Sequence, residues 1–155
     1  MRVWRICRQP YVSHALDGLG GLYASGRWHS QGNPIVYTAT SPALAALEVL
    51  VQVDPLTAPA DLSLLAIDLP ANLSMENLEA DALPQNWAAV PAPKELQLLG
   101  SSWLLSTRTA ALSVPSAVIH LERNILINPN HPEAAGISLS SVTPFTFDPR
   151  LFTRR

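Results

Sequence analysis

The sequence predicts a compact α+β domain of short strands and a few helices spanning residues 1–155. Short runs rich in β-branched and aromatic residues are typical of strands. One segment carries both the start and the stop signals of a helix. The 14 prolines among 155 residues divide the chain into short elements and exclude a bundle of long helices. A chain of this length can bury one core, and no composition change marks a domain boundary.

Two strands are predicted before residue 40. Residues 3–7 (VWRIC) form the first, with Arg5 on the face that looks into solvent or a cleft. The glycine-rich segment at residues 16–28 must turn sharply, and its glycines do not complete a dinucleotide-binding fingerprint. The second strand is predicted at residues 34–38 (PIVYT), which include Tyr37.

A helix is predicted from about Pro42 to Gln52. Ser41 is suited to cap it and Pro42 to occupy its first turn, and the following Asp-Pro turn ends it. Successive residues are rotated by about 100°, which places Glu48 among leucines and valines, and apolar residues cover most of the other sides. A helix that is apolar on nearly all sides is buried, so we expect Glu48 at or near the interior.

The remaining elements follow from the same signals and from the positions of the prolines. A strand is predicted at 62–70, followed by irregular structure at 73–93 that Trp87 anchors. A helix within 94–107 runs towards Gly100, and a second helical or extended piece follows around Trp103. Three more strands are predicted, at 109–120 with a break at Pro115, at 124–128 and at 142–152.

Composition excludes several classes of protein. No apolar run approaches the roughly 18–20 residues that span a bilayer, and no apolar core follows the N-terminal arginines as in a signal peptide. The single Cys7 cannot form an internal disulfide, which makes the cytoplasm the default location. The net charge of −2 and the absence of a basic run argue against direct binding of nucleic acid.

Glu48 is unusual because it is a carboxylate on an otherwise almost wholly apolar helix. A buried carboxylate must be neutralised or must acquire a partner. Arg27 and Arg5 are the nearest candidates, since the strand and turn before the helix lead back to them. An arginine would lower the pKa of the carboxyl and burial would raise it. A buried structural ion pair, a surface arginine and a core tyrosine remain open as ordinary interpretations of Glu48, Arg27 and Tyr37.

Three stretches together resemble the RES domain, a family of bacterial toxins. They are VWRI at the N-terminus, GRWHSQGNPIVYTATSPALAALEVL at residues 26–50 and VPSAVIHLERNILINPNHP at residues 114–132. The resemblance covers nearly the whole chain, and several separated motifs match in the right order. It implies an ADP-ribosyltransferase-like fold and an enzyme that cleaves the nicotinamide–ribose bond of NAD+, by hydrolysis or phosphorolysis.

The family motifs carry over onto five residues of this chain. Arg27 is the arginine of the GRW motif, Tyr37 the strand tyrosine, Glu48 the glutamate of LEVL, Ser116 the serine of VPSA and Arg5 a further arginine in the first strand. The resemblance implies that Glu48, Arg27 and Ser116 are catalytic. It also implies that Arg5, Arg27, Tyr37 and Ser116 bind NAD+.

Physical chemistry supplies roles for these residues. The two arginines suit the diphosphate, the carboxylate suits a cationic ribose, and the tyrosine ring suits the nicotinamide. Ser116 is expected to orient Glu48 or to contact ribose or diphosphate. It is not a hydrolase nucleophile, because no G-x-S-x-G elbow surrounds it.

Two further residues were weighed beside these five. His29 departs from the commoner GRWN form, so a local hydrogen bond is expected to differ without loss of activity. Asn128 could support the site, but a turn role before Pro129 is favoured.

The resemblance also implies an Xre-like helix-turn-helix antitoxin that covers the cleft or inserts a chain terminus into it, and it allows a homodimer within their complex. Operator binding would belong to that partner. Two other functions stay open: transfer of ADP-ribose to a protein, and a non-catalytic binding module. No metal is expected, because the four histidines show no metal-binding spacing. They are His14, His29, His120 and His131.

Overall fold

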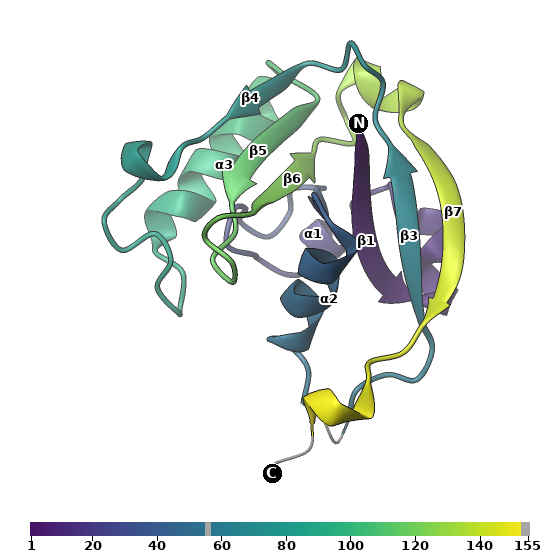
Figure 1. Cartoon of the computed structure of the whole chain (residues 1–155). Coiled ribbons are helices and arrows are strands. Elements are labelled where there is room, and N and C mark those ends of the chain that lie inside the picture. Colours follow the sequence, from purple (N-terminus) through teal and green to yellow (C-terminus); the bar gives the residue numbers. More distant parts are fainter. Residues whose placement is uncertain (55–56, 153–155) are drawn as a thin grey trace.

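A computed structural model describes residues 1–54 and 57–152 of the chain. In these residues seven strands form one sheet in the order β4-β5-β6-β2-β1-β3-β7 (Figure 1). All neighbouring strands run antiparallel except β4 and β5. The strands are β1 (Arg2–Arg8), β2 (Val36–Ala39), β3 (Leu62–Asp68), β4 (Met75–Asn77), β5 (Ala111–Pro115), β6 (Arg123–Ile127) and β7 (Ser138–Phe145).

Three α-helices accompany this sheet in the described residues. They are α1 (Gly20–Tyr23), α2 (Pro42–Leu50) and α3 (Lys94–Ser106). Four short 3-10 turns complete the regular structure, at Gln9–His14, Ala80–Ala82, Pro132–Gly136 and Pro149–Leu151. The predicted α+β class with short strands and a few helices is confirmed.

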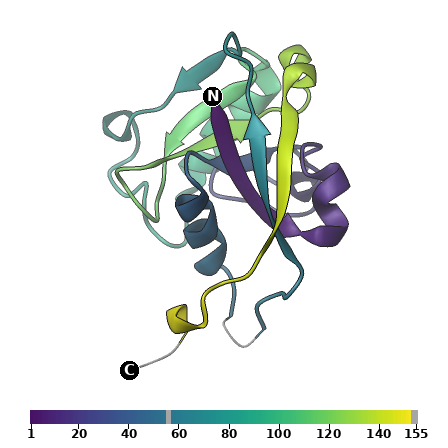
Figure 2. The same ribbon diagram turned by 45° about the vertical axis from the view of Figure 1, so that its right-hand side comes forward.

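The sheet consists of two halves that are joined by very little backbone pairing. Strand β1 pairs with β3 along seven residues, but its pairing with β2 is limited to Trp4 opposite Ala39. Figures 1 and 2 show the result: β1, β3 and β7 form one twisted half, β4, β5 and β6 form the other together with β2, and α2 lies beside their junction. Backbone groups near the junction are therefore available to side chains, and Arg5 uses one of them.

One buried apolar cluster spans both halves, because Val3 and Leu65 of one half belong to it together with Val36 and Ile125 of the other. Two further clusters lie beneath α3 and around α2. Helix α3 packs on the β5–β6 half through Leu96, Trp103 and Leu104, which meet Trp28, Leu112 and Leu126. Leu44 and Ala45 of α2 are buried, together with Ile6 and Phe147. The rest of α2 is only half-buried or exposed, so the expectation of a helix enclosed on nearly all sides is wrong. Glu48 is half-buried, at the border of the interior.

Most predicted elements are present with small shifts at their ends. The strands expected at 3–7, 34–38, 62–70 and 124–128 are β1, β2, β3 and β6, and the helix expected at 42–52 is α2. Ser41 caps α2 as predicted, since its Oγ accepts a hydrogen bond from the Leu44 amide at 3.1 Å. The Asp-Pro turn predicted to follow lies partly outside the described residues.

Three predictions were wrong in detail. Helix α3 continues through Gly100 to Ser106 as one element. The strand expected at 109–120 ends at Pro115, because the next residue begins a turn. The last strand starts and ends earlier than predicted: β7 covers Ser138–Phe145, and the tail after it is held by edge-to-face contacts of Phe147 with two other phenylalanines. The short strand β4 had not been predicted.

Across residues 1–54 and 57–152, no helix combines the length and the apolar character that a membrane span requires.

Candidate active site

Glu48 is held by two side chains from the β5–β6 hairpin. Its Oε1 accepts a hydrogen bond of 2.8 Å from Oγ of Ser116 and one of 2.6 Å from Nδ2 of Asn124. Within the described residues no hydrogen bond reaches Oε2. One oxygen thus fixes the orientation of the carboxylate, and the other remains for a ligand.

Ser116 is fully buried directly after β5, and all the hydrogen bonds of its hydroxyl are made within the protein. Its Oγ accepts hydrogen bonds from the amides of Val118 and Ile119, both at 3.1 Å. A hydroxyl has one proton to donate, and that proton goes to Glu48. Of the roles expected for Ser116, the structure shows the one in which it orients Glu48.

The same hairpin also holds the beginning of α2. Oγ of Ser41 donates a hydrogen bond of 2.8 Å to Oε2 of Glu122, and the carbonyl of Glu122 accepts one of 3.0 Å from the Ser116 amide. The helix cap and Ser116 are therefore both bonded to Glu122. The cap fixes the start of α2, and the bonds to Ser116 and Asn124 fix the glutamate on it.

Arg27 lies on a turn that is clamped against α3. The carbonyl of Gly26 accepts a hydrogen bond of 3.0 Å from Gln97, and the amide of Ser30 donates one of 2.9 Å to Ser101. Between these bonds, the Trp28 carbonyl lies so near Gly100 that a Cβ added there would be 1.8 Å from its oxygen. Only glycine permits this approach, because it has no Cβ. Gly100 is therefore required inside α3 for packing and does not mark the end of the helix.

The guanidinium of Arg27 is anchored at one end. Its Nη1 donates to the carbonyls of Trp87 at 2.7 Å and Ala89 at 3.0 Å. Partial burial lowers the pKa of Arg27, and the negative charge of Glu48 opposes this to a smaller extent. Within the described residues the other two guanidinium nitrogens make no hydrogen bond, so they are available to a ligand. Trp87, predicted to anchor the irregular segment at 73–93, packs partly buried against the cluster beneath α3, and its carbonyl also holds Arg27.

Arg5 lies at the junction of the two half-sheets. Its Nη1 donates a hydrogen bond of 3.0 Å to the carbonyl of Tyr37, and its Nε is buried without a partner among the described residues. Burial lowers the pKa of Arg5, because the charged form loses solvation. A half-buried cation with a buried, unused donor is costly to the free protein.

Tyr37 lies between these two arginines. Its carbonyl accepts a hydrogen bond from Arg5. Its phenol interacts electrostatically with Arg27 and opposes the lowering of the Arg27 pKa by burial. The hydroxyl accepts a hydrogen bond of 3.2 Å from the Trp28 amide and lies 2.8 Å from Nδ1 of His29. Burial raises the pKa of the Tyr37 phenol, so the hydroxyl keeps its proton.

Charge pairing separates these two arginines from the rest. Five other arginines of the described chain pair with carboxylates: Arg2 with Asp68, Arg8 with Asp61, Arg108 with Glu76, Arg123 with Glu79 and Arg150 with Asp148. Among the described residues Arg5 and Arg27 have no carboxylate within 4 Å. The expectation of a direct ion pair with Glu48 is therefore wrong: Ser116 and Asn124 bond to the carboxylate, whose charge acts on Arg27 only at longer range.

Asn124 is the site residue that the sequence did not reveal. It lies on β6, and its Oδ1 is buried without a partner among the described residues. Asn128 has the turn role that was favoured: Nδ2 donates to the carbonyl of Leu104, and Oδ1 accepts from the amide of Asn130. The four histidines have separate partners, namely Asp17, Tyr37, Trp87 and the amide of Glu133.

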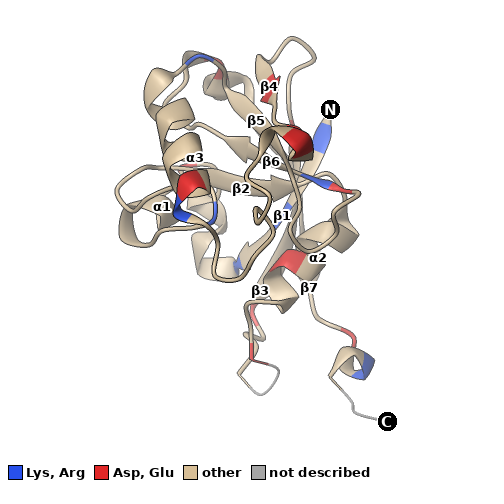
Figure 3. Cartoon of the chain, turned by 90° about the vertical axis from the view of Figure 1, so that its left-hand side faces the viewer, with Lys and Arg blue, Asp and Glu red and all other residues tan. Residues whose placement is uncertain are grey.

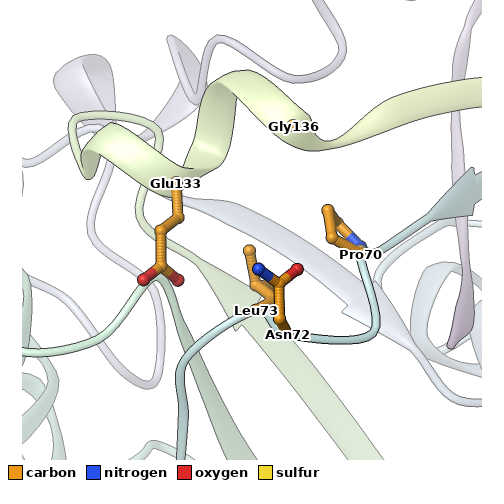
Figure 4. Close-up of a pocket in the computed structure, with 5 residues that line it drawn as sticks. All are labelled: Pro70, Asn72, Leu73, Glu133 and Gly136. Carbon is orange, nitrogen blue, oxygen red and sulfur yellow. The ribbon is translucent and has the colours of Figure 1, made fainter.

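Hollows elsewhere on the surface lack this chemistry. One of about 220 Å³ lies between Pro70, Asn72, Leu73, Glu133 and Gly136 (Figure 4). Its carboxylate is already bonded to the amide and the hydroxyl of Ser74, both at 2.7 Å. Another, of about 590 Å³, lies between Leu16, Asp17 and side chains of residues 129–137. Neither hollow is lined by the site residues. The candidate site is therefore identified by its hydrogen bonds and unpaired charges, and not by the depth of a pocket.

Comparisons with known proteins identify the family of the chain. The pattern of the RES domain matches residues 2–148. The chain is 43% identical over 154 residues to "Toxin Res" of Pseudomonas putida, covering 98% of this chain and 100% of that protein. It is 39% identical over 155 residues to "Prs ADP-ribosylating toxin" of a Sphingobium species, covering 97% and 96%.

A solved structure shares the fold. A chain of the MbcT-MbcA toxin-antitoxin complex of M. tuberculosis superposes with a TM-score of 0.76 at 16% identity, over 97% of this chain and 86% of that one. The family pattern spans nearly the full sequence, and relatives above 30% identity span it as well. The chain therefore belongs to the RES domain family.

Proposed function

We propose that this protein is the toxin of a toxin–antitoxin pair and that it degrades NAD+ by cleaving the nicotinamide–ribose bond. The observation that carries the proposal is the pair of arginines without carboxylate partners, Arg5 and Arg27, on either side of Tyr37 and near a glutamate with one free oxygen. The names of the relatives support the toxin class.

The arginines suit an anion with two phosphates. Arg5 offers a buried Nε and Arg27 offers its unused nitrogens, and guanidinium groups bind phosphate oxygens by paired, directional hydrogen bonds. A ligand diphosphate would supply a negative charge to both arginines, which have no carboxylate partner among the described residues. Binding would then relieve the desolvation that lowers both pKa values in the free protein.

Glu48 suits the bond that breaks. Departure of neutral nicotinamide leaves an electron-deficient ribose, and a fixed carboxylate beside it stabilises the developing positive charge. Ser116 and Asn124 hold Oε1, so Oε2 can face the ribose without reorganisation during the reaction. Water or phosphate then adds to the ribose carbon, which gives hydrolysis or phosphorolysis.

Tyr37 contributes its ring more than its hydroxyl. The hydroxyl is already bonded to Trp28 and His29, whereas the aromatic face can stack on the nicotinamide. NAD+ is thus the substrate of the proposed reaction, and the site residues require no metal for this chemistry.

Transfer of ADP-ribose to a protein is the second candidate function. It is favoured by the 39% identity with a relative named as an ADP-ribosylating toxin. Both reactions use the same cleavage and differ only in the acceptor. Label from adenine-labelled NAD+ that remains on protein after denaturation supports transfer, and free nicotinamide with soluble ADP-ribose supports degradation.

An antitoxin is the proposed partner, because the chain shares its fold with a component of a toxin–antitoxin complex. We assign it an Xre-like helix-turn-helix and the operator binding, since the net charge of this chain is −2 and its basic residues are scattered (Figure 3). We place the action in the cytoplasm, where the cofactor pool is, and allow a toxin homodimer within the complex.

The proposal is tested by incubating the purified chain with NAD+, with and without phosphate, and identifying the products. Glu48→Gln is the decisive variant, because its amide oxygen can still accept from Ser116 and Asn124 while the charge is removed. It should bind NAD+ but lose more than about 100-fold in kcat. Glu133→Gln is the matched control, since that carboxylate also accepts from a serine but lies in another hollow. Intact NAD+ after incubation with the wild type, or equal activity of both variants, would refute the proposal.

A further inference from the structure

We infer that His29 is a positioning residue for NAD+ binding that acts through Tyr37: its Nδ1 accepts the hydroxyl proton of Tyr37, and the pair holds the turn that carries Arg27. The role of this turn in NAD+ binding rests on the function proposed above. The hydrogen bonds themselves do not depend on that function.

The proton positions follow from the partners of the imidazole. Nε2 of His29 lies 2.8 Å from the carbonyl oxygen of Ala24, which can only accept, so Nε2 carries a proton. Burial lowers the pKa of His29, which favours the neutral ring and leaves a lone pair on Nδ1. That lone pair lies 2.8 Å from the Tyr37 hydroxyl, so Tyr37 donates to His29.

These bonds form a directed chain across the turn. The Trp28 amide donates to the Tyr37 oxygen, Tyr37 donates to Nδ1 of His29, and Nε2 donates to Ala24. Each donor has one acceptor, and reversing the middle bond would require a second proton on the ring. The geometry therefore specifies one arrangement of Tyr37 and His29.

The chain encloses the backbone of Arg27 on both sides. Trp28 follows Arg27, and Gly26 precedes it and donates its amide to the carbonyl of His29 at 3.0 Å. A Cβ on Gly26 would lie 2.6 Å from the Tyr37 hydroxyl and 2.9 Å from Nδ1 of His29. The turn is thus closed onto the Tyr37–His29 pair, and Arg27 starts from a fixed backbone towards Trp87 and Ala89.

Two substitutions separate the two hydrogen bonds of the ring. In His29→Asn, the amide oxygen occupies the place of Nδ1 and can accept from Tyr37, but nothing reaches Ala24. In His29→Gln, the amide nitrogen reaches the place of Nε2 and can donate to Ala24, but the acceptor for Tyr37 is lost. The inference assigns the function to the bond with Tyr37, so the two variants should differ.

Steady-state kinetics with NAD+ gives the first test. His29→Gln should raise KM about fivefold to tenfold, the effect of one hydrogen bond, with kcat changed less than about twofold. His29→Asn should stay within about twofold of the wild type in both constants. His14→Gln is the control, because His14 is exposed and pairs with Asp17. Equal KM values for the Asn and Gln variants would overturn the inference, whether both are normal or both are raised.

A double-mutant cycle guards against a general loss of folding. Tyr37→Phe keeps the ring and removes the hydroxyl, so His29→Gln should add little to its effect on KM. Additive effects in the double variant would count against the coupling. Melting temperatures identify variants that are merely unfolded.

NMR of the ¹⁵N-labelled imidazole gives a second readout that needs no substrate. The wild type should show a neutral His29 with its proton on Nε2, and Tyr37→Phe should shift the Nδ1 resonance. A proton on Nδ1 would overturn the inference directly. A wild type that does not bind NAD+ would instead refute the proposed function, while the spectrum would still decide the hydrogen bond.

Discussion

The hydroxyl of Ser116 donates its only proton to Oε1 of Glu48 at 2.8 Å, across 68 residues of sequence. Because Oγ also accepts from two backbone amides, the hydroxyl cannot turn towards a substrate without losing three hydrogen bonds. The serine of this family member is therefore best understood as part of the support of the carboxylate. This view distinguishes its expected mutant behaviour from that of a substrate-binding residue.

Ser116→Ala should lower kcat for NAD+ cleavage about 10-fold to 100-fold while leaving KM within about threefold, because the carboxylate loses orientation but the arginines remain. Loss of the acceptor for two amides should also cost about 1–2 kcal/mol of unfolding free energy. Kinetics and chemical denaturation measure the two effects. Ser63→Ala, a buried serine on β3, serves as control. A large rise in KM with normal kcat would show that Ser116 contacts the substrate instead.

Asn124→Asp should be more damaging than Asn124→Ala. An ionised aspartate has the size of asparagine but cannot donate, and it would place a second negative charge within hydrogen-bond distance of Glu48. The alanine variant loses only the 2.6 Å bond. We expect kcat near pH 7.5 to fall at least about tenfold further in the aspartate variant. Comparable rates for the two variants would show that Asn124 does not control the carboxylate.

Gly100→Ala should destabilise the turn that carries Arg27. The added methyl group would meet the Trp28 carbonyl at 1.8 Å, and neither α3 nor the turn can yield without breaking the bonds of Gln97 and Ser101. We expect a loss of about 3 kcal/mol or more in unfolding free energy, measured by denaturant titration. Gly20→Ala is the matched control, because a Cβ there has nothing within 4 Å. Equal stability of the two variants would contradict this account of the contact.

The stability of the protein should decline as the pH falls from 7 to 5, in part through His29. Its pKa is lowered from 6.5 by burial, so below pH 6.5 the unfolded chain binds a proton that the native state resists. Unfolding free energy therefore decreases as acid is added. Calorimetry at several pH values should show a smaller decline for His29→Asn. The exposed carboxylates with lowered pKa values, such as Asp61 and Asp68, lose their contributions only at more acidic pH.

Local signals explain what the sequence could predict. The cap at Ser41 and the proline after it determine where α2 begins, and the alternation in VWRIC determines the face of Arg5. These features depend on neighbours in the chain. The position of Glu48 on α2 was therefore predictable, as were the two strands that carry Arg5 and Tyr37.

Contacts between distant segments explain what it could not. Asn124 looks like an ordinary residue of a strand, and only the approach of α2 from 76 residues away gives its amide a role. Gly100 suggests a helix end, but the contact with Trp28 makes it necessary inside the helix. The alternating phenylalanines of the tail suggest a strand, and their edge-to-face packing depends on the finished fold. The absence of an Arg–Glu48 contact likewise depends on the three-dimensional arrangement.

Arg5→Met should be at least as stable as the wild type and should bind NAD+ much more weakly. In the free protein Arg5 is a half-buried cation whose buried Nε has no partner among the described residues, and it makes one hydrogen bond, to the Tyr37 carbonyl. Methionine has a similar volume and removes the cost of desolvating the guanidinium, so we expect its effect on stability to be neutral or stabilising. The melting temperature of Arg5→Met should thus equal or exceed that of the wild type, and calorimetric titration should detect at least about a 100-fold loss in NAD+ affinity. Arg8→Met is the control, because Arg8 is exposed and paired with Asp61. A destabilised Arg5→Met with unchanged NAD+ affinity would mean that Arg5 serves the junction of the half-sheets rather than the ligand.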